Sequence, residues 1–500
     1  MADKVVLIRP KNVYNYNNYP PLNLILLGSK LKAAGFEIKI INCAFETDHL
    51  ATIKKELDGA LMVAVAILTS EAPDAYEVIK FIKEQTKAPV VVGGWHCTLF
   101  PEQMAKCEYV DYVIAGEGED HILEIATALK EGRKIEQKIF PKQILDMDKL
   151  PFPDYSLDEH IETFINSYLT DKLSEFVPQP MRWLPYESSR GCPSRCTFCI
   201  NVVADNRRYR KKSAAKVLAE IEQIVKKYRL THLKILDDNF FVDCDRVRAI
   251  CAGIIKLGLN ITWDGECRVD YFNETMLNDD TLALARESGL IQLTLGIESG
   301  SPHTLKLMKK GITPQQAEHA VKKCDEHGII PRSSFILEIP GEKLSDIKQT
   351  VAFINKLRRY PLFTCGVGTF RPYPKCELTQ QLLKEGYLTE PKDFKEWTSR
   401  AIIDMYTASE YVRPWQVNGK FSESAAYYLN MESESRIGNH QLDSRRDRLI
   451  NTIFIAIAGL RNRFMFYKLP IDKLLFKNFL TAFYRKRAAK EQKALQGDKK

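Results

Sequence analysis

Short apolar segments alternate with helical segments along most of the chain, and this alternation limits the fold more than any other feature of the sequence. In the first 140 residues the candidate strands are 4–8, 37–41, 61–68, 89–92 and 112–115, and the helical patterns between them are 22–34, 73–85 and 119–130. Strands that alternate with helices pair in parallel, with helices on both faces of the sheet. Residues 1–140 are therefore predicted to form a doubly wound, Rossmann-like α/β domain.

A second alternating series follows a less regular stretch, residues 141–183, in which Pro151, Pro153, Pro178 and Pro180 predict a linker with one short helix at most. The candidate strands are then 184–188, 232–236, 262–268, 292–296, 333–337 and 365–370, and the helices are 214–228, 245–257, 278–288, 314–327 and 344–358. Six such units predict a partial (β/α)6 barrel over residues 184–390, with its active site at the carboxyl ends of the strands. Residues 391–500 are predicted to form a helical C-terminal region.

Composition agrees with folded domains and excludes several classes of protein. Hydrophobic residues make up 45% of the 500 residues and charged residues 27%, which excludes a largely disordered chain and a membrane bundle. The last forty residues carry a net charge of +9 and the other 460 sum to −1, so no nucleic-acid partner is expected. Twelve cysteines without a regular framework, and no leader pattern before the first strand, predict a reduced, cytoplasmic protein.

The strongest local signal is a cysteine motif placed after the first strand of the predicted barrel. Residues 190–199 read RGCPSRCTFC, so Cys192, Cys196 and Cys199 have the spacing C-x-x-x-C-x-x-C. Three thiolates from one loop can hold three irons of a 4Fe-4S cluster and leave the fourth iron open to a small molecule. Structural zinc needs four ligands and a catalytic dithiol needs two cysteines, so both alternatives explain the motif less well.

This motif resembles that of the radical S-adenosylmethionine superfamily, in which it follows the first strand of a six-unit partial barrel and an aromatic residue, here Phe198, precedes the third cysteine. The resemblance implies that S-adenosylmethionine binds the open iron and is cleaved to a 5′-deoxyadenosyl radical. It also implies an electron donor of the flavodoxin or ferredoxin type.

Further matches to the superfamily lie at successive strand ends, at residues 236–240, 266–268, 296–299 and 339–342. By resemblance, the residues that bind S-adenosylmethionine are Phe198, Asp237, Asp238, Glu266, Arg268, Glu298 and Ser299. Four of them have an ordinary alternative: the two aspartates can cap helices, Glu298 can be a solvated carboxylate, and Arg268 can pair with Asp270 or Glu266. The cysteines outside the motif are expected to be small buried residues.

Three loops of the first domain follow strands at the same edge of its predicted sheet. They are Thr69-Ser70, Gly93-Gly94-Trp95-His96 and Gly116-Glu117-Gly118-Glu119. Glycine lets the backbone approach a ligand closely, so the loops predict one binding site, although ordinary strand-to-helix turns are an alternative.

The two-domain arrangement resembles the cobalamin-binding group of the superfamily, which includes radical methyltransferases and anaerobic cyclases. The resemblance implies that Ser70, Gly93, Gly94, Trp95 and Glu117 bind cobalamin. No D-x-H-x-x-G motif surrounds His49, His96 or His121, so cobalamin is expected to bind without a histidine lower ligand, and His96 to bond to backbone or cofactor amides.

The resemblance implies methylation of an unactivated carbon in a small-molecule or lipid-like substrate. A radical cyclase or rearrangement enzyme of the same architecture, and a non-catalytic cofactor carrier, are the alternatives. The sequence does not identify the substrate or a catalytic acid or base, because barrels of one kind host many reactions.

The C-terminal region offers two candidate membrane segments. Residues 450–460 are too few to cross a bilayer, which takes about 20 helical residues. Residues 471–484 form a basic amphipathic pattern that fits docking on the barrel, the favoured interpretation, or peripheral contact with the inner membrane face.

Overall fold

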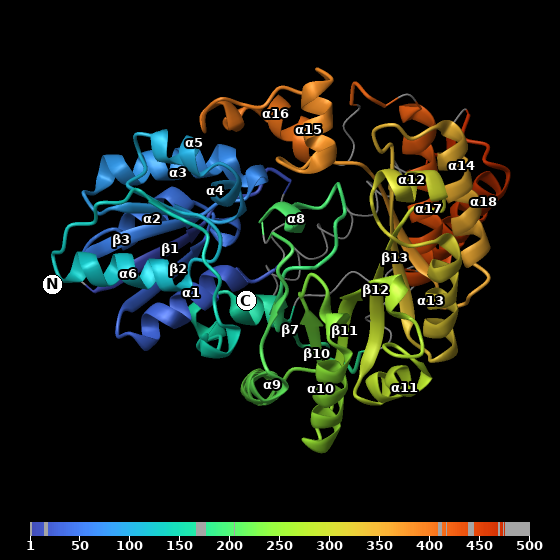
Figure 1. Ribbon diagram of the computed structural model, residues 1–500, viewed down its shortest axis with the longest axis horizontal. Coiled ribbons are helices and arrows are strands. Elements are labelled where there is room, and N and C mark those ends of the chain that lie inside the picture. Colours follow the sequence, from blue (N-terminus) through green and yellow to red (C-terminus); the bar gives the residue numbers. More distant parts are fainter. Residues whose placement is uncertain are drawn as a thin grey trace.

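A computed structural model describes residues 3–14, 19–166, 177–204, 206–408, 413–416, 418–438, 445–468, 471–473 and 475. Two α/β bodies lie side by side, and two helices, α17 (Gly419–Gly438) and α18 (Arg445–Phe464), lie at the far end of the second body (Figure 1). The predicted amphipathic segment 471–484 lies mostly outside the described residues.

The first body is a fully parallel six-stranded sheet with the order β2-β1-β3-β4-β5-β6. Its strands are β1 (Lys4–Arg9), β2 (Glu37–Asn42), β3 (Ala60–Ala66), β4 (Val90–Gly93), β5 (Tyr112–Ile114) and β6 (Ile139–Phe140). In β1, Val5 and Leu7 pack in one core with α1 (Leu22–Ala33) and α6 (Glu119–Lys130). Val6 and Ile8 pack in the other with α2 (His49–Glu56) and α3 (Ala72–Gln85). Both faces are thus covered, which confirms the predicted doubly wound fold.

Several short elements of this domain were not predicted. They are β6, α2, α4 (Trp95–Leu99) and α5 (Pro101–Lys106). A two-residue strand and a five-residue helix are too short to display a period of hydrophobicity, so neither leaves a sequence pattern.

The second body is a six-stranded parallel sheet with the order β14-β13-β12-β11-β10-β7. Its strands are β7 (Trp183–Tyr186), β10 (His232–Ile235), β11 (Thr262–Cys267), β12 (Leu290–Glu298), β13 (Ile330–Leu337) and β14 (Thr364–Thr369). Its outer helices are α9 (Ala214–Tyr228), α10 (Cys244–Lys256), α11 (Asp279–Glu287), α13 (Pro314–Glu326) and α14 (Leu344–Leu357). β7 and β14 stand at opposite edges of the sheet, so the barrel is partial, as predicted.

The edge strand β14 is covered by helix α17 (Gly419–Gly438). The Asn430 side chain accepts a hydrogen bond from the Val367 amide at 2.7 Å and donates one to the Val367 carbonyl at 2.8 Å. The Ser433 hydroxyl accepts another from the Cys365 amide at 2.7 Å. Because an open strand edge exposes unpaired backbone groups, these side chains replace a seventh strand.

The predicted linker and the region after the barrel both pack closely on their neighbours. Residues 141–166 hold one short helix, α7 (Ile161–Ile165), and the buried Tyr155 donates a hydrogen bond to the Pro185 carbonyl of β7. Helix α16 (Arg400–Thr407) lies against the first domain, where Asp404 accepts a hydrogen bond from Tyr14 at 2.8 Å. The C-terminal region therefore divides between the two bodies. Of the helices that the structure describes, none has the length and apolar character needed to cross a membrane.

Candidate functional site

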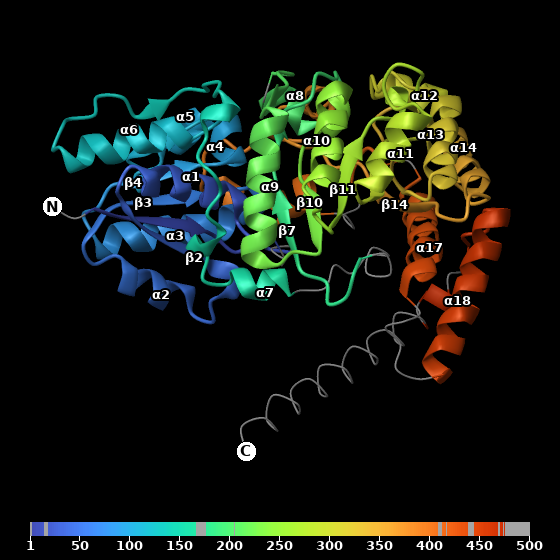
Figure 2. The ribbon, with the colours of Figure 1, turned by 90° about the horizontal axis from the view of Figure 1, so that it is seen from below.

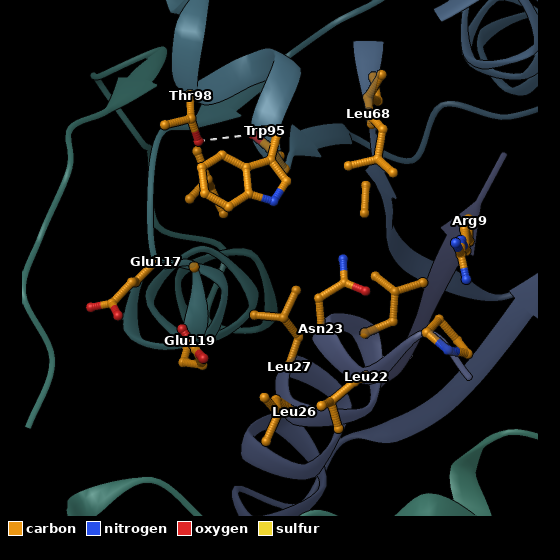
Figure 3. Close-up of a pocket in the computed structure, with 18 of the residues that line it drawn as sticks. Arg9, Leu22, Asn23, Leu26, Leu27, Leu68, Trp95, Thr98, Glu117 and Glu119 are labelled. Carbon is orange, nitrogen blue, oxygen red and sulfur yellow. Dashed lines mark hydrogen bonds between the residues drawn. The ribbon is translucent and has the colours of Figure 1, made fainter. Parts of the chain in front are cut away.

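A cavity of about 490 Å³ lies at the carboxyl end of the first sheet (Figure 3). It adjoins β1 and β3, parallel neighbours whose following helices, α1 and α3, pack on opposite faces of the sheet. Strand ends at Arg9, Ile67, Gly93 and Gly116 line it on one side. The second domain lines it on the other, through residues that include Arg190, Leu236 and Asp238. In open α/β sheets such a switch point is where ligands bind, and here the site opens directly onto the barrel.

The glycine loop after β4 forms one wall of the cavity. Gly94 has φ of +91°, and a Cβ there would lie 2.9 Å from both the backbone N and O of Ile67. A side chain at Gly94 is therefore excluded by conformation and by space, and glycine lets this loop pack directly on the backbone of Ile67. The next residue, Trp95, is 36% exposed and its ring points into the cavity (Figure 3).

Helix α1 forms the facing wall, which the sequence motifs did not reveal. Leu22, Leu26 and Leu27 line the cavity together with Asn23, whose side chain faces Trp95 across it (Figure 3). One feature of the sequence could have indicated this role: α1 is apolar on nearly all sides. A helix that covers a sheet with one face and a ligand with the other needs apolar residues on both faces. The mainly apolar lining with a few polar groups fits a large, flat macrocycle that carries amide arms.

Two predicted residues of this domain do not line the cavity. The Ser70 hydroxyl accepts a hydrogen bond from the Asn12 side chain at 2.6 Å, which ties together the loops after β1 and β3. The prediction that Ser70 binds the cofactor is therefore not supported by its position. His96 is fully buried among Phe100, Phe394 and Trp397, and its Nδ1 lies 3.3 Å from the Thr69 hydroxyl.

Burial lowers the pKa of His96 to about 3 and keeps the ring neutral. A folded-state pKa below the unfolded value of about 6.5 means that stability is complete above pH 6.5 and falls as the pH is lowered. Between pH 6.5 and 5 we expect a loss of about 2 kcal/mol, which urea unfolding at several pH values measures. The loss of stability between pH 6.5 and 5 should disappear in His96→Phe. It should persist in the control His319→Gln, which changes an exposed histidine. An unchanged pH profile in His96→Phe would contradict the assignment.

The three motif cysteines lie on the loop between β8 (Ser189–Arg190) and α8 (Ile200–Ala204), at the carboxyl end of the barrel. Thr197 fixes this loop: its amide donates to the Met308 carbonyl at 3.0 Å and its carbonyl accepts from the Leu378 amide at 3.1 Å. The Gly191 amide donates to Asp238 at 2.9 Å. The loop is thus held by three other segments of the barrel.

Two side chains place N–H groups beside the motif sulfurs. The Asn239 amide lies 3.5 Å from Cys192 Sγ and the Arg268 guanidinium 4.0 Å from Cys196 Sγ. Burial raises the pKa of the Cys196 thiol, and that of the Cys199 thiol to about 12, so a metal must displace their protons on binding. Three thiols with a neutral amide donor and a guanidinium near them fit a thiolate-ligated iron-sulfur cluster. Asn239 was not among the predicted site residues.

Two polar residues predicted to bind S-adenosylmethionine face the protein instead. Asp237 is buried and accepts hydrogen bonds from the Ser188 amide and from the hydroxyls of Ser188 and Ser189. Ser299 is also buried and shares a 2.8 Å hydrogen bond with Thr350. Both side chains hydrogen-bond to neighbouring segments and so hold the turns that follow their strands. Their positions do not support the prediction that they bind the cofactor.

Glu298, at the end of β12, forms an ion pair that the sequence did not predict. Its carboxylate lies 3.0 Å from Lys310 Nζ, and both side chains are largely buried. A Cβ at Gly296 would lie 2.8 Å from both of these groups, so glycine makes room for the pair. Glu298 has φ of +68°, a strained conformation typical of functional sites. The Lys310 ammonium also lies 5.8 Å from the centre of the Phe198 ring, beside the cysteine loop.

Glu266 and Arg268 end β11 on the inner face of the barrel. Arg268 pairs with Asp270 at 2.9 Å, as the ordinary alternative suggested, and still reaches the Cys196 sulfur. The Glu266 side chain is exposed to the barrel interior but enclosed by protein, and this desolvation, with Asp238 among the nearby carboxylates, raises its pKa to about 7 while Lys234 opposes the shift.

The barrel interior contains open space beside Glu266. Glu266 pairs with Thr294, and Thr294 pairs with Arg332, so the three residues share one face of the sheet. Gly366 and Gly368 of β14 continue that face, and no described atom lies within 4 Å of a Cβ built at either position. The inner face of the barrel sheet therefore carries charged side chains on β11 and β13 and an uncovered glycine wall on β14.

Arg190, directly before the cysteine motif, joins the two domains. Its guanidinium lies 3.1 Å from Glu117, 2.6 Å from Glu119 and 2.8 Å from Glu187. Glu117 lines the cavity, and its carboxylate is also held by Arg210 at 3.1 Å and turns toward the second domain. The loop that bounds the first cavity is therefore fixed directly to the loop that carries the cysteines.

Comparison with known proteins adds independent information. Residues 13–126 match the B12 binding domain family and residues 186–354 match the Radical SAM superfamily. An uncharacterized methyltransferase of Pyrococcus horikoshii is 31% identical over 389 residues, covering 74% of this chain and 80% of that protein. The anaerobic magnesium-protoporphyrin IX monomethyl ester cyclase of Rubrivivax gelatinosus is 25% identical over 408 residues, covering 76% and 69%.

Among solved structures, the fold is similar to that of OxsB, a cobalamin-dependent S-adenosylmethionine radical enzyme with aqua-cobalamin bound. The TM-score is 0.73 at 17% identity, over 96% of this chain and 75% of OxsB. At this identity the similarity concerns the fold alone.

Proposed function

The chain belongs to the cobalamin-binding radical S-adenosylmethionine enzymes, and from that premise we propose that it methylates an unactivated carbon of a small-molecule or lipid-like substrate. The observation that supports this most is the cavity shared by the two domains, which is lined by the glycine loops and by Leu236 and Asp238 of the barrel. Group transfer between cofactors requires that both reach one substrate, and this shared wall brings them together. The relative at 31% identity is also called a methyltransferase.

The chain's own residues have distinct tasks in this proposal. When bound, the 4Fe-4S cluster and S-adenosylmethionine supply a 5′-deoxyadenosyl radical, and cobalamin supplies a transferable methyl group. Cys192, Cys196 and Cys199 would hold the cluster. Gly94 and Trp95 would bind the macrocycle against α1. The uncovered wall at Gly366 and Gly368 would leave room for the substrate in the barrel interior.

We further propose that cobalamin is bound without a histidine lower ligand. Among the residues that line the cavity in the described chain there is no histidine, and His96 is turned into an aromatic cluster. Paramagnetic resonance of the Co(II) form should show no nitrogen splitting from histidine, in the natural protein and in His96→Leu alike. Nitrogen splitting that His96→Leu removes would overturn this part of the proposal.

Reduction of such a cluster needs a low-potential one-electron donor, and we propose a flavodoxin or ferredoxin in the cytoplasm. This partner can be tested by adding reduced flavodoxin in place of dithionite. Release of 5′-deoxyadenosine with reduced flavodoxin as the sole reductant would support it. Release with dithionite but not with reduced flavodoxin or ferredoxin would contradict it.

The proposed reaction predicts that methyl-labelled S-adenosylmethionine transfers its label to product. Anaerobically reconstituted protein, reductant and candidate substrates would be incubated, and label in the product and 5′-deoxyadenosine would both be measured. A radical cyclase or rearrangement enzyme would form 5′-deoxyadenosine and product without label, as the similarity to a cyclase allows. A cofactor carrier would form neither, and either result would contradict methyl transfer.

A further inference from the structure

We propose that helix α18 (Arg445–Phe464) docks the protein on an anionic membrane surface. Large apolar side chains stand out from it: Leu449, Ile453, Leu460 and Phe464 are 50% to 71% exposed, and Phe466 follows at 53%. We call these five residues the outer face of α18. Their spacing of four or seven residues within the helix places them on one side, so they form one apolar surface.

The opposite side of α18 makes the contacts that hold the helix on the rest of the protein. Ala458 and Asn462 are fully buried, and the Asn462 amide donates to the Tyr428 carbonyl at 3.0 Å and to Glu432 at 2.8 Å. The Asn462 carbonyl accepts from Asn355 of α14 at 2.9 Å. Since these contacts fix the helix, the outer face is not needed for packing within the described chain, and its exposure calls for an external partner.

Positive charge surrounds the outer face. Arg445, Arg446, Arg448, Arg463 and Lys468 are all exposed. The acidic Asp472 is held by Arg461 at 2.5 Å. Over residues 445–475 the sequence carries seven Lys or Arg against two aspartates. An apolar face bordered by arginine and lysine is the pattern of a helix that lies in the headgroup region of a bilayer, where the apolar residues insert and the cations meet anionic lipids.

Charge also argues against two other partners for the outer face, namely residues 476–500 of the same chain and a second copy of the protein. Residues 476–500 carry eight Lys or Arg against two acidic residues, so this segment would bring more positive charge to a positive surface. A second copy of the chain would oppose two like-charged faces. An anionic lipid surface complements both the outer face and the basic residues that follow it.

The position of α18 leaves the active site free during docking. Figures 1 and 2 show α18 at the end of the molecule away from the first domain, behind α17 and α14. Because none of the described helices spans a bilayer, the contact would be peripheral. Such a surface would hold the barrel close to lipid-borne molecules.

The experiment uses the full-length protein and sedimentation with vesicles of phosphatidylcholine alone or of equal parts phosphatidylcholine and phosphatidylglycerol. We expect binding to the mixed vesicles at least about tenfold tighter, and weakened by high salt because the charges are exposed. The double variant Leu460→Glu, Phe464→Glu should lower this affinity at least tenfold. The matched control Leu257→Glu, Tyr387→Glu changes two exposed residues elsewhere and should bind normally.

Three results would overturn the proposal: no preference for phosphatidylglycerol, equal binding by the outer-face variant, or loss of a dimer in that variant by analytical ultracentrifugation. Deletion of residues 476–500 should weaken binding but leave a component that depends on the outer face. Release of 5′-deoxyadenosine in the absence of vesicles should be unchanged in all variants, which separates membrane docking from the proposed reaction.

Discussion

Replacing Cys196 with alanine is expected to reduce bound iron and 5′-deoxyadenosine formation to the level of protein-free controls. Cys196 is the buried middle cysteine of the loop, and its sulfur lies beside the Arg268 guanidinium. With only Cys192 and Cys199 left, the loop cannot hold three irons, so the site for S-adenosylmethionine is lost with the cluster. Iron analysis, the visible absorbance of the reconstituted protein and product chromatography measure the three consequences.

The control for this prediction is Cys376→Ala. Cys376 is buried at the start of α15 (Glu377–Lys384), near enough to Cys199 for that thiol to contribute to its raised pKa. If three cysteines hold the cluster, Cys376→Ala should keep full iron content and activity. A loss equal to that of Cys196→Ala would mean a fourth cysteine ligand and no open iron, and the proposed chemistry would fail.

The sequence predicted the elements and loops of the site better than the direction of individual side chains. The strands and the cysteine loop follow from periodicity and spacing, which are local properties. Asp237 and Asp238 are neighbours, yet Asp237 accepts hydrogen bonds from Ser188 and Ser189 while Asp238 borders the cavity. Adjacent residues point in different directions after a strand, and only the packed structure shows which one faces the ligand.

The residues missed by sequence reasoning act through contacts between distant segments. Lys310 follows the short helix α12 (Pro302–Leu307) and is noticed only because it folds back onto Glu298. The leucines of α1 were predicted only as part of a helix, since nothing in a single sequence separates a face that covers a sheet from one that lines a cavity. Partners of this kind are set by tertiary packing.

Arg190 shows how such distant contacts control the relation between the two domains. It stands one residue before Gly191 of the cysteine loop and binds Glu117 and Glu119, which follow β5 of the first domain. A displacement of either loop would separate the two cofactor sites. Burial raises the pKa of Glu187, the third carboxylate on this guanidinium. Arg190 therefore offsets the cost of burying these acids, and Arg210 does so as well at Glu117.

Replacing Arg190 with methionine is therefore expected to destabilise the protein by about 3–5 kcal/mol, because the substitution leaves buried carboxylates without their partner. The matched control is Arg133→Met, whose exposed pair with Glu131 should cost less than about 1 kcal/mol. Urea unfolding followed by tryptophan fluorescence gives both values.

The pH dependence of this loss identifies its cause. Burial already raises the pKa of Glu187 while Arg190 opposes the shift, so without Arg190 this pKa should lie further above the unfolded value of about 4.3. The variant should therefore gain stability as the pH falls toward that value. The deficit of Arg190→Met should accordingly be smaller at pH 5 than at pH 8. A deficit that is equal at both pH values would reflect lost packing alone, and the interdomain role of the ion pairs would then be wrong.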